Sequence, residues 1–129
     1  MNILDENVVE TQCRLLRKWR IRFRQIGFGL GSEGMKDNEI ISLLHDLTRP
    51  TFFTRDDDFF DRNLCHAGYC LVHTSVEKNE VAVFTRRLLR HPEFNTKAKR
   101  MGSVVRVSHA GLLVWRLHAE KTQRFDWPD

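Results

Sequence analysis

Short apolar runs alternate with stretches of helical spacing along most of the chain. Residues 1–4 (MNIL), 51–54 (TFFT) and 69–74 (YCLVHT) are mostly apolar on consecutive positions, as in strands that are covered on both faces of a sheet. Residues 20–25 (RIRFRQ) alternate basic and apolar side chains, which is the period of a strand with one solvated face. The glycines that follow open a loop. The pattern predicts a strand in each of these four segments.

Amphipathic spacing predicts three helices between and after these strands. The first follows residue 4, and residues 5–7 (DEN) offer side chains that can cap it. The second covers residues 37–47, opens on an acid and ends before Pro50, because proline cannot continue a helix. The third covers residues 79–91 and stops near Pro92. The predicted buried faces hold Val8, Cys13, Leu16, Trp19, Ile40, Ile41, Leu43, Leu44, Leu47, Val81, Phe84 and Leu88.

Strands that alternate with helices predict an α/β fold, a three-layer, Rossmann-like domain with a central, mostly parallel sheet and helices on both faces. We expect about four parallel strands, with residues 1–4 near the centre of the sheet. Residues 103–117 (SVVRVSHAGLLVWRL) predict a C-terminal β-hairpin that turns at residues 109–111. The expected layout is one domain over residues 1–129, with a core at 2–91, a mobile basic connector at 92–102, and the hairpin and tail at 103–129.

The composition is that of a globular protein, with 41% hydrophobic and 29% charged residues. No apolar run approaches the length that crosses a bilayer, so we expect a cytoplasmic protein without a membrane partner. The cysteines are odd in number and lack metal-site spacing, which favours buried free thiols at Cys13, Cys65 and Cys70.

Charge divides unevenly along the chain. Residues 1–61 hold eleven acids and nine bases, a net charge of −2, whereas residues 62–129 hold six acids and twelve bases, a net charge of +6. A carboxylate-rich half joined to a basic half suits a protein that holds a cation and then a polyanion. A scattered, solvated surface charge is the competing interpretation.

Three acids follow or precede predicted elements in a way that brings them to one edge of the sheet. Asp5 ends the first strand, Asp37 begins the second helix, and Asp56 follows the strand at 51–54. Sites in open α/β sheets form beyond the carboxyl ends of the strands. Such acids would bind Mg²⁺ or Mn²⁺, which prefer oxygen ligands, with Asp58 within reach through the turn. The alternative is that Asp5 and Asp37 only cap helices and that residues 56–58 form an exposed turn.

Three ordered motifs, NILDENV, GMKDNEIISLL and TFFTRDDDFF, resemble those of the PIN-like nucleases, in particular the short PIN-like family of toxins. The resemblance covers roughly residues 2–75. It implies a PIN-like fold and metal-dependent cleavage of RNA, commonly by a toxin with a cognate antitoxin. It also implies that Asp5, Asp37 and Asp56 surround the Mg²⁺ or Mn²⁺ ion and that Asp58 is an accessory catalytic acid.

The chain departs from the family in one respect. Typical PIN domains carry a further acid on a helix between the first strand and the Asp-x-x-Ile helix, and here only Glu6, Glu10 and Glu33 are available, without a matching motif. This absence favours a second hypothesis, a catalytically silent PIN-like module that binds nucleic acid or a protein.

Basic residues provide candidates for contacts with RNA. A solvated helix face is the alternative for those on the third helix. The candidates are Arg55, Arg86, Arg87, Arg90, Lys97, Lys99 and Arg100.

A homodimer is also predicted, because PIN-like toxins often pair and the hairpin is more apolar than one face of it needs. The alternative is that these side chains cover the sheet edge within one subunit. The residues concerned are Leu112, Leu113, Val114 and Trp115.

Overall fold

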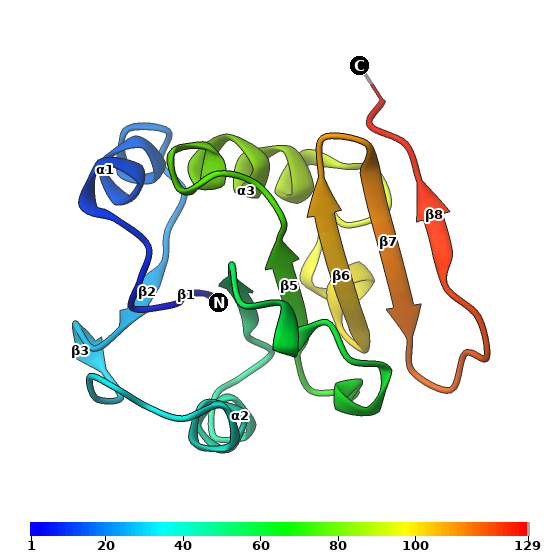
Figure 1. The fold of residues 1–129 in the computed structure, drawn as a ribbon, viewed down its shortest axis with the longest axis horizontal. Coiled ribbons are helices and arrows are strands. Elements are labelled where there is room, and N and C mark those ends of the chain that lie inside the picture. The colour runs from blue at the N-terminus through cyan, green and yellow to red at the C-terminus, as the bar shows by residue number, and fades with distance from the viewer. Residues whose placement is uncertain (129) are drawn as a thin grey trace.

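The computed structural model describes residues 1–128 and has one eight-stranded mixed sheet at its centre, in the order β3-β2-β1-β4-β5-β6-β7-β8 (Figure 1). Asp129, the last residue of the predicted tail, lies outside the described residues. The strands are β1 (Asn2–Leu4), β2 (Arg24–Ile26), β3 (Gly29–Leu30), β4 (Thr51–Thr54), β5 (Cys70–Thr74), β6 (Ser103–Ser108), β7 (Gly111–Arg116) and β8 (Gln123–Phe125).

Neighbouring strands from β3 to β6 pair in parallel, and β7 and β8 add antiparallel pairs at one edge. The predicted α/β class with a mostly parallel sheet is confirmed, and the parallel part is larger than expected because β3 and β6 also belong to it. β1 pairs with β2 on one side and with β4 on the other, so its predicted interior position is also confirmed.

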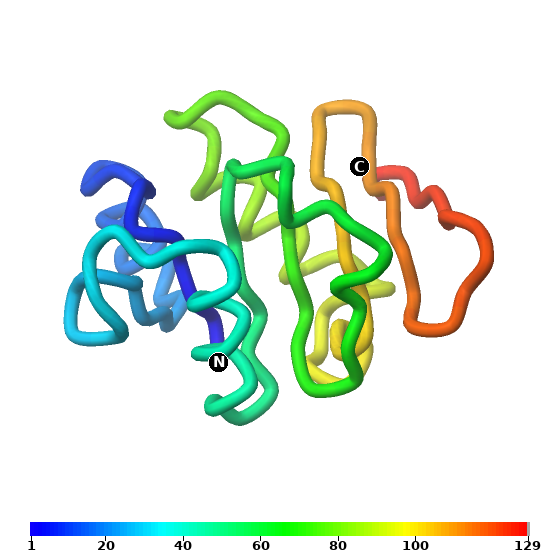
Figure 2. The backbone as a smooth tube through the Cα atoms, turned by 60° about the horizontal axis from the view of Figure 1, so that its bottom comes forward, coloured from blue at the N-terminus to red at the C-terminus, as the bar shows by residue number. Residues whose placement is uncertain are grey.

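Helices cover both faces of the sheet. The helices α1 (Glu10–Lys18) and α3 (Val81–Arg90) lie on one face and α2 (Asp37–His45) on the other (Figure 1). Figure 2 shows the amino-terminal third and the C-terminal strands at opposite ends of the sheet. The short helical elements are η1 (Asp57–Phe59), η2 (Arg62–Leu64), η3 (Lys78–Glu80) and α4 (Lys97–Arg100).

Two apolar clusters explain why the central strands are apolar on consecutive positions. Leu4 and Phe53 pack with the buried faces of α1 and α3, whereas their neighbours Ile3 and Phe52 pack with the buried face of α2. Successive side chains of a strand point to opposite faces, so a strand covered on both sides needs an apolar residue at every position.

The order of the strands reverses between β1 and β4. From β1 the chain passes through α1 and builds β2 and β3 outward, and it then crosses by way of α2 to β4 and continues in the opposite direction. The carboxyl ends of the two strands that flank such a reversal are where sites form in open α/β sheets. Asp5 and Asp56 follow these two strands.

The segment between α1 and α2 differs most from its prediction. Of the strand expected at residues 20–25, only the last two residues pair, as part of β2, because Arg20 adopts a left-handed conformation (φ 60°) that closes the end of α1. The helix itself begins at Glu10 behind Val9, which makes no side-chain cap, so the predicted capping by residues 5–7 is wrong. That segment instead turns, and the Val8 amide donates to the Asp5 carbonyl oxygen at 3.2 Å.

The basic connector at 92–102 is folded against the sheet rather than extended as a polar loop. Arg100 is buried: its Nε donates to Thr51 Oγ1 at 3.0 Å and its Nη1 to the Phe94 carbonyl oxygen at 2.8 Å. The Arg116 guanidinium also donates to the Lys99 carbonyl oxygen at 2.8 Å. These bonds fix the connector at the amino end of β4 and beside β7.

The C-terminal strands complete the core of the subunit. Leu112 and Val114 are fully buried within the chain itself, which favours the alternative that they cover the sheet rather than a partner. Cys13 and Cys70 are buried free thiols, as predicted, and Cys65 is half-buried. Burial raises the pKa of the Cys70 thiol to about 12. Within the described residues, no helix is long and apolar enough to cross a membrane.

Candidate metal centre

A threonine ties together the two acids at the strand reversal. The Asp5 amide donates to the Phe53 carbonyl oxygen at 3.0 Å, so the pairing of β1 with β4 continues up to this acid. Thr54 is buried, and its hydroxyl donates to Asp5 Oδ2 at 2.6 Å and accepts from the Asp56 amide at 3.0 Å. One side chain therefore fixes the carboxylate that follows β1 and the backbone that follows β4.

A tight turn brings a second aspartate back beside Asp56. Asp56 Oδ1 accepts the Asp58 amide at 2.9 Å, which starts the 3-10 turn η1. The turn is anchored by Phe59, which is buried and meets Phe52 edge-on, with ring centroids 5.2 Å apart. The aspartate block, residues 56–58, therefore has its conformation fixed by buried phenylalanines on both sides.

Three carboxylates converge at this place from two distant segments. One oxygen each of Asp37, Asp56 and Asp58 lies within 4.8 Å of the others, and among the described residues this is the one group of three or more side chains able to hold a metal ion. Asp56 is half-buried, whereas Asp37 and Asp58 are exposed. Partial desolvation raises the pKa of the Asp37 carboxyl, and the charges of Asp56, Asp58 and Asp5 raise it further.

The sequence predicted these four acids with a different division of roles. Asp5 was expected among the metal ligands, but it is outside the group of converging oxygens and acts on Asp37 through its charge. Asp58, expected as an accessory, belongs to the group. Asp57 is exposed and outside it.

Two further residues shape the site through hydrogen bonds that the sequence did not indicate. Gln25 is buried, and its Nε2 donates to the carbonyl oxygens of Asp5 at 3.1 Å and Val8 at 2.9 Å, which holds the loop after β1. Glu6 Oε1 accepts the Gly34 amide at 2.9 Å, which ties that loop to the segment leading into α2. For Gln25, the only sequence signal was a lone amide in the apolar register of residues 20–25.

The three carboxylates fit a hard divalent cation. Oxygens around an octahedral Mg²⁺ ion lie roughly 3–4 Å apart, since each is about 2.1 Å from the ion. The oxygens of Asp37, Asp56 and Asp58 lie within 4.8 Å of one another, so a small movement of exposed side chains closes the set. The mutual repulsion that raises the pKa of Asp37 also favours a bound cation.

The basic residues predicted to contact RNA are engaged in different ways. Arg100 is buried and cannot reach a polymer from its position, which corrects that prediction. The Arg86 guanidinium lies over the Trp19 ring at 3.6 Å, and the Arg87 guanidinium lies over the Trp127 ring at 4.3 Å. Arg55 donates through Nε to the Val76 carbonyl oxygen at 2.9 Å, close behind the aspartate block. The exposed candidates are Arg55, Arg90, Lys97 and Lys99.

No protein-family model, curated protein or solved structure matches this chain. The fold class stands on the strand order and pairing described above. The chemistry of the site stands on the carboxylates and on the hydrogen bonds that place them.

Proposed function

We propose that the chain is a metal-dependent ribonuclease of PIN-like type that acts as the toxin of a toxin–antitoxin pair. The observation that carries the proposal is the meeting of Asp37, Asp56 and Asp58 at the carboxyl ends of β1 and β4, where the strand order reverses. RNA would be the substrate, and the resemblance adds a cognate antitoxin as the protein partner.

In this proposal Asp37, Asp56 and Asp58 hold Mg²⁺ or Mn²⁺. When bound, such an ion lowers the pKa of a water molecule and neutralises charge on a phosphate. Thr54 holds Asp5 by one carboxylate oxygen and leaves the other without a hydrogen-bond partner in the described chain. Asp5 is therefore the candidate general base for an attacking water, and the buried Gln25 keeps its loop in place.

The second candidate is a catalytically silent PIN-like binding module. One observation favours it: Glu6, the nearest candidate for the additional acid of PIN domains, is engaged with the Gly34 amide. Of the other two candidates, Glu10 is ion-paired with Arg17 at 2.9 Å on α1. The ligands available to a metal ion would then be limited to the aspartates, without the additional acid of typical PIN domains.

Cleavage of a labelled single-stranded RNA by the purified chain separates the two candidates. We expect cleavage with Mn²⁺ or Mg²⁺ and none in EDTA. Asp56→Asn should lower the rate by at least about 100-fold, because it removes the central ligand. The matched control, Asp57→Asn, removes the same charge from an exposed position outside the group and should cleave normally. Cleavage that survives EDTA or Asp56→Asn would contradict the proposal, and a lack of cleavage by the wild type would favour the silent module.

A further inference from the structure

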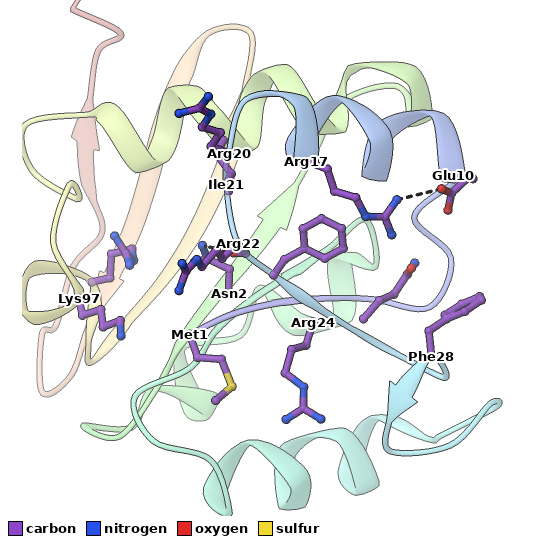
Figure 3. Close-up of a pocket in the computed structure, with 13 residues that line it drawn as sticks. Met1, Asn2, Glu10, Arg17, Arg20, Ile21, Arg22, Arg24, Phe28 and Lys97 are labelled. Atoms are coloured by element: carbon purple, nitrogen blue, oxygen red, sulfur yellow. Dashed lines mark hydrogen bonds and ion pairs between the residues drawn. The ribbon is translucent and has the colours of Figure 1, made fainter.

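A second site lies along β2, away from the acidic group. It is a cleft of about 1120 Å³ bounded by α1, the chain that leaves α1, β2, and α4. Figure 3 shows Lys97 at one end, Phe28 and Glu10 at the other, and Arg22 beside Asn2 between them. The cationic residues of the cleft are Arg17, Arg20, Arg22, Arg24, Lys97 and Arg100.

The positive charge of the cleft is mostly uncompensated. Among the described residues, Glu10 is the only acid that lines it, and Glu10 already accepts from Arg17 at 2.9 Å, as the dashed line in Figure 3 marks. Arg20 and Arg22 are exposed, and their guanidinium groups have no hydrogen-bond or ion-pair partner among the described residues. Arginines without carboxylates along a groove attract a polyanion.

Arg20 occupies a position that normally favours glycine. Its amide donates to the Arg17 carbonyl oxygen and the Ile21 amide to the Leu16 carbonyl oxygen, both at 2.9 Å, which is the pattern of a helix closed by a left-handed residue. A side chain at φ 60° makes this closure less stable than glycine would. Arg20 lowers the stability of the helix end and lies in the wall of a basic cleft. We therefore infer that its side chain has a functional role.

An exposed aromatic ring stands at the other end. Phe28 is 67% exposed, the largest exposed fraction among the large apolar side chains of the described residues. It sits in the turn between β2 and β3, held by Gly27 (φ 84°) and Gly29 (φ 85°). Proteins that bind single-stranded nucleic acids combine an exposed aromatic ring with a row of cationic side chains. The bases stack on the ring, and the phosphates follow the cations.

We propose that this cleft binds single-stranded nucleic acid, with the phosphates along Lys97, Arg22 and Arg20 and an unpaired base stacked on Phe28. An acidic segment of a protein would match the charge but would leave the exposed ring without a role. The Phe28 end adjoins Gly27, which lies against the Glu6 side chain, and Glu6 bonds Gly34 in the segment that leads to Asp37. The strand would thus be led toward the acidic group, and this last step rests on the proposed function.

Fluorescence anisotropy with a labelled single-stranded oligonucleotide of about 12 nucleotides tests the cleft. The measurement is made in EDTA and with the Asp56→Asn variant, so that binding is separated from cleavage. Arg20→Gly and Arg22→Gln should each weaken binding about three- to tenfold and make the salt dependence shallower by about 0.7. Phe28→Ala should weaken it about tenfold, and Phe28→Trp should restore it. Arg124→Gln, which removes an exposed charge from β8 at the opposite edge of the sheet, is the control and should bind like the wild type.

Arg20→Gly also separates function from folding. It should raise the melting temperature, since glycine suits the left-handed position, while it weakens binding. Binding of RNA, of DNA or of both supports the proposal, because the phosphodiester backbone is common to them. Unchanged affinity in Arg20→Gly and Arg22→Gln, an equal loss in Arg124→Gln, or tighter binding of a duplex or of polyglutamate would overturn it. Binding through the cleft without cleavage would reject only the proposed function.

Discussion

The carboxylate of Asp37 is in a less favourable environment than that of an isolated aspartate. Partial desolvation is the first cause, and the negative charges of Asp56, Asp58 and Asp5 add to it. A raised pKa means that the ionised form is disfavoured in the folded state relative to the unfolded chain. Without a bound cation, this environment lowers the stability of the fold wherever Asp37 is charged.

Asp37→Asn should consequently stabilise the metal-free protein at neutral pH. The penalty is absent below the ordinary aspartate pKa near 3.8 and develops as the pH rises through the raised pKa, so the difference from the wild type should vanish in acid. Asp37 is exposed, and screening limits the effect to a rise of about 1–2 °C in the melting temperature. Differential scanning calorimetry in EDTA across pH checks this. Saturating Mn²⁺ should reverse the order, because only the wild type has the complete ligand set.

Thr54 is the residue whose loss should disturb the site most for the smallest change in shape. Thr54→Val removes the hydroxyl that donates to Asp5 and accepts from the Asp56 amide, and it leaves both groups without that partner. We expect a loss of about 1–3 kcal/mol in the free energy of unfolding, measured with urea and tryptophan fluorescence. Thr54→Ser keeps the hydroxyl and is the control. Equal stability of the two variants would show that the bridge contributes nothing.

Elements with a fully buried apolar run were predictable to within a residue, whereas the segment between α1 and α2 was not. β4 matches its prediction at Thr51–Thr54 because an apolar run bounded by Pro50 and the aspartate block allows no other strand. The end of α1 was hidden because Arg20 stands where glycine would have marked the stop. β3 has only two residues, too few to show a period.

The edge of the sheet depends on a glycine at the start of β7. A Cβ at Gly111 would lie 2.6 Å from the Phe125 carbonyl oxygen of β8, and its φ of 134° disfavours a side chain. Gly111→Ala should lower the free energy of unfolding by about 2 kcal/mol or more and displace β8. Gly34→Ala, at φ 73° with nothing within 4 Å of its Cβ, carries only the conformational cost of roughly 1 kcal/mol.

Urea denaturation measures the free energy of unfolding of both glycine variants. The fluorescence of Trp127 reports on β8, because Trp127 follows this strand and its Nε1 donates to the Ser108 carbonyl oxygen at the end of β6 at 2.8 Å. A Gly111→Ala protein as stable as Gly34→Ala would contradict the predicted clash.

At the scale of the whole molecule, the predicted topology gave the location of the acidic site more accurately than it gave the set of aspartates that form it. The rule that sites form at the carboxyl ends of strands placed Asp5, Asp37 and Asp56 at one edge from the sequence alone. The sequence placed Asp58 within reach through the turn, but its membership of the converging group depends on the hydrogen bond from its amide to Asp56 Oδ1, which starts the 3-10 turn. The basic cleft was missed because the charges of residues 20–25 suggested only a solvated strand face.

Binding of Mn²⁺ is the most direct test of the claim that the carboxylates at the strand reversal form a cation site. Isothermal titration calorimetry of the metal-free protein should show one saturable site in the wild type and in Asp57→Asn. Asp37→Asn and Asp56→Asn should each weaken binding by at least about tenfold, because each removes one of the converging ligands. No saturable binding by the wild type, or equal affinity in Asp56→Asn and Asp57→Asn, would contradict the claim.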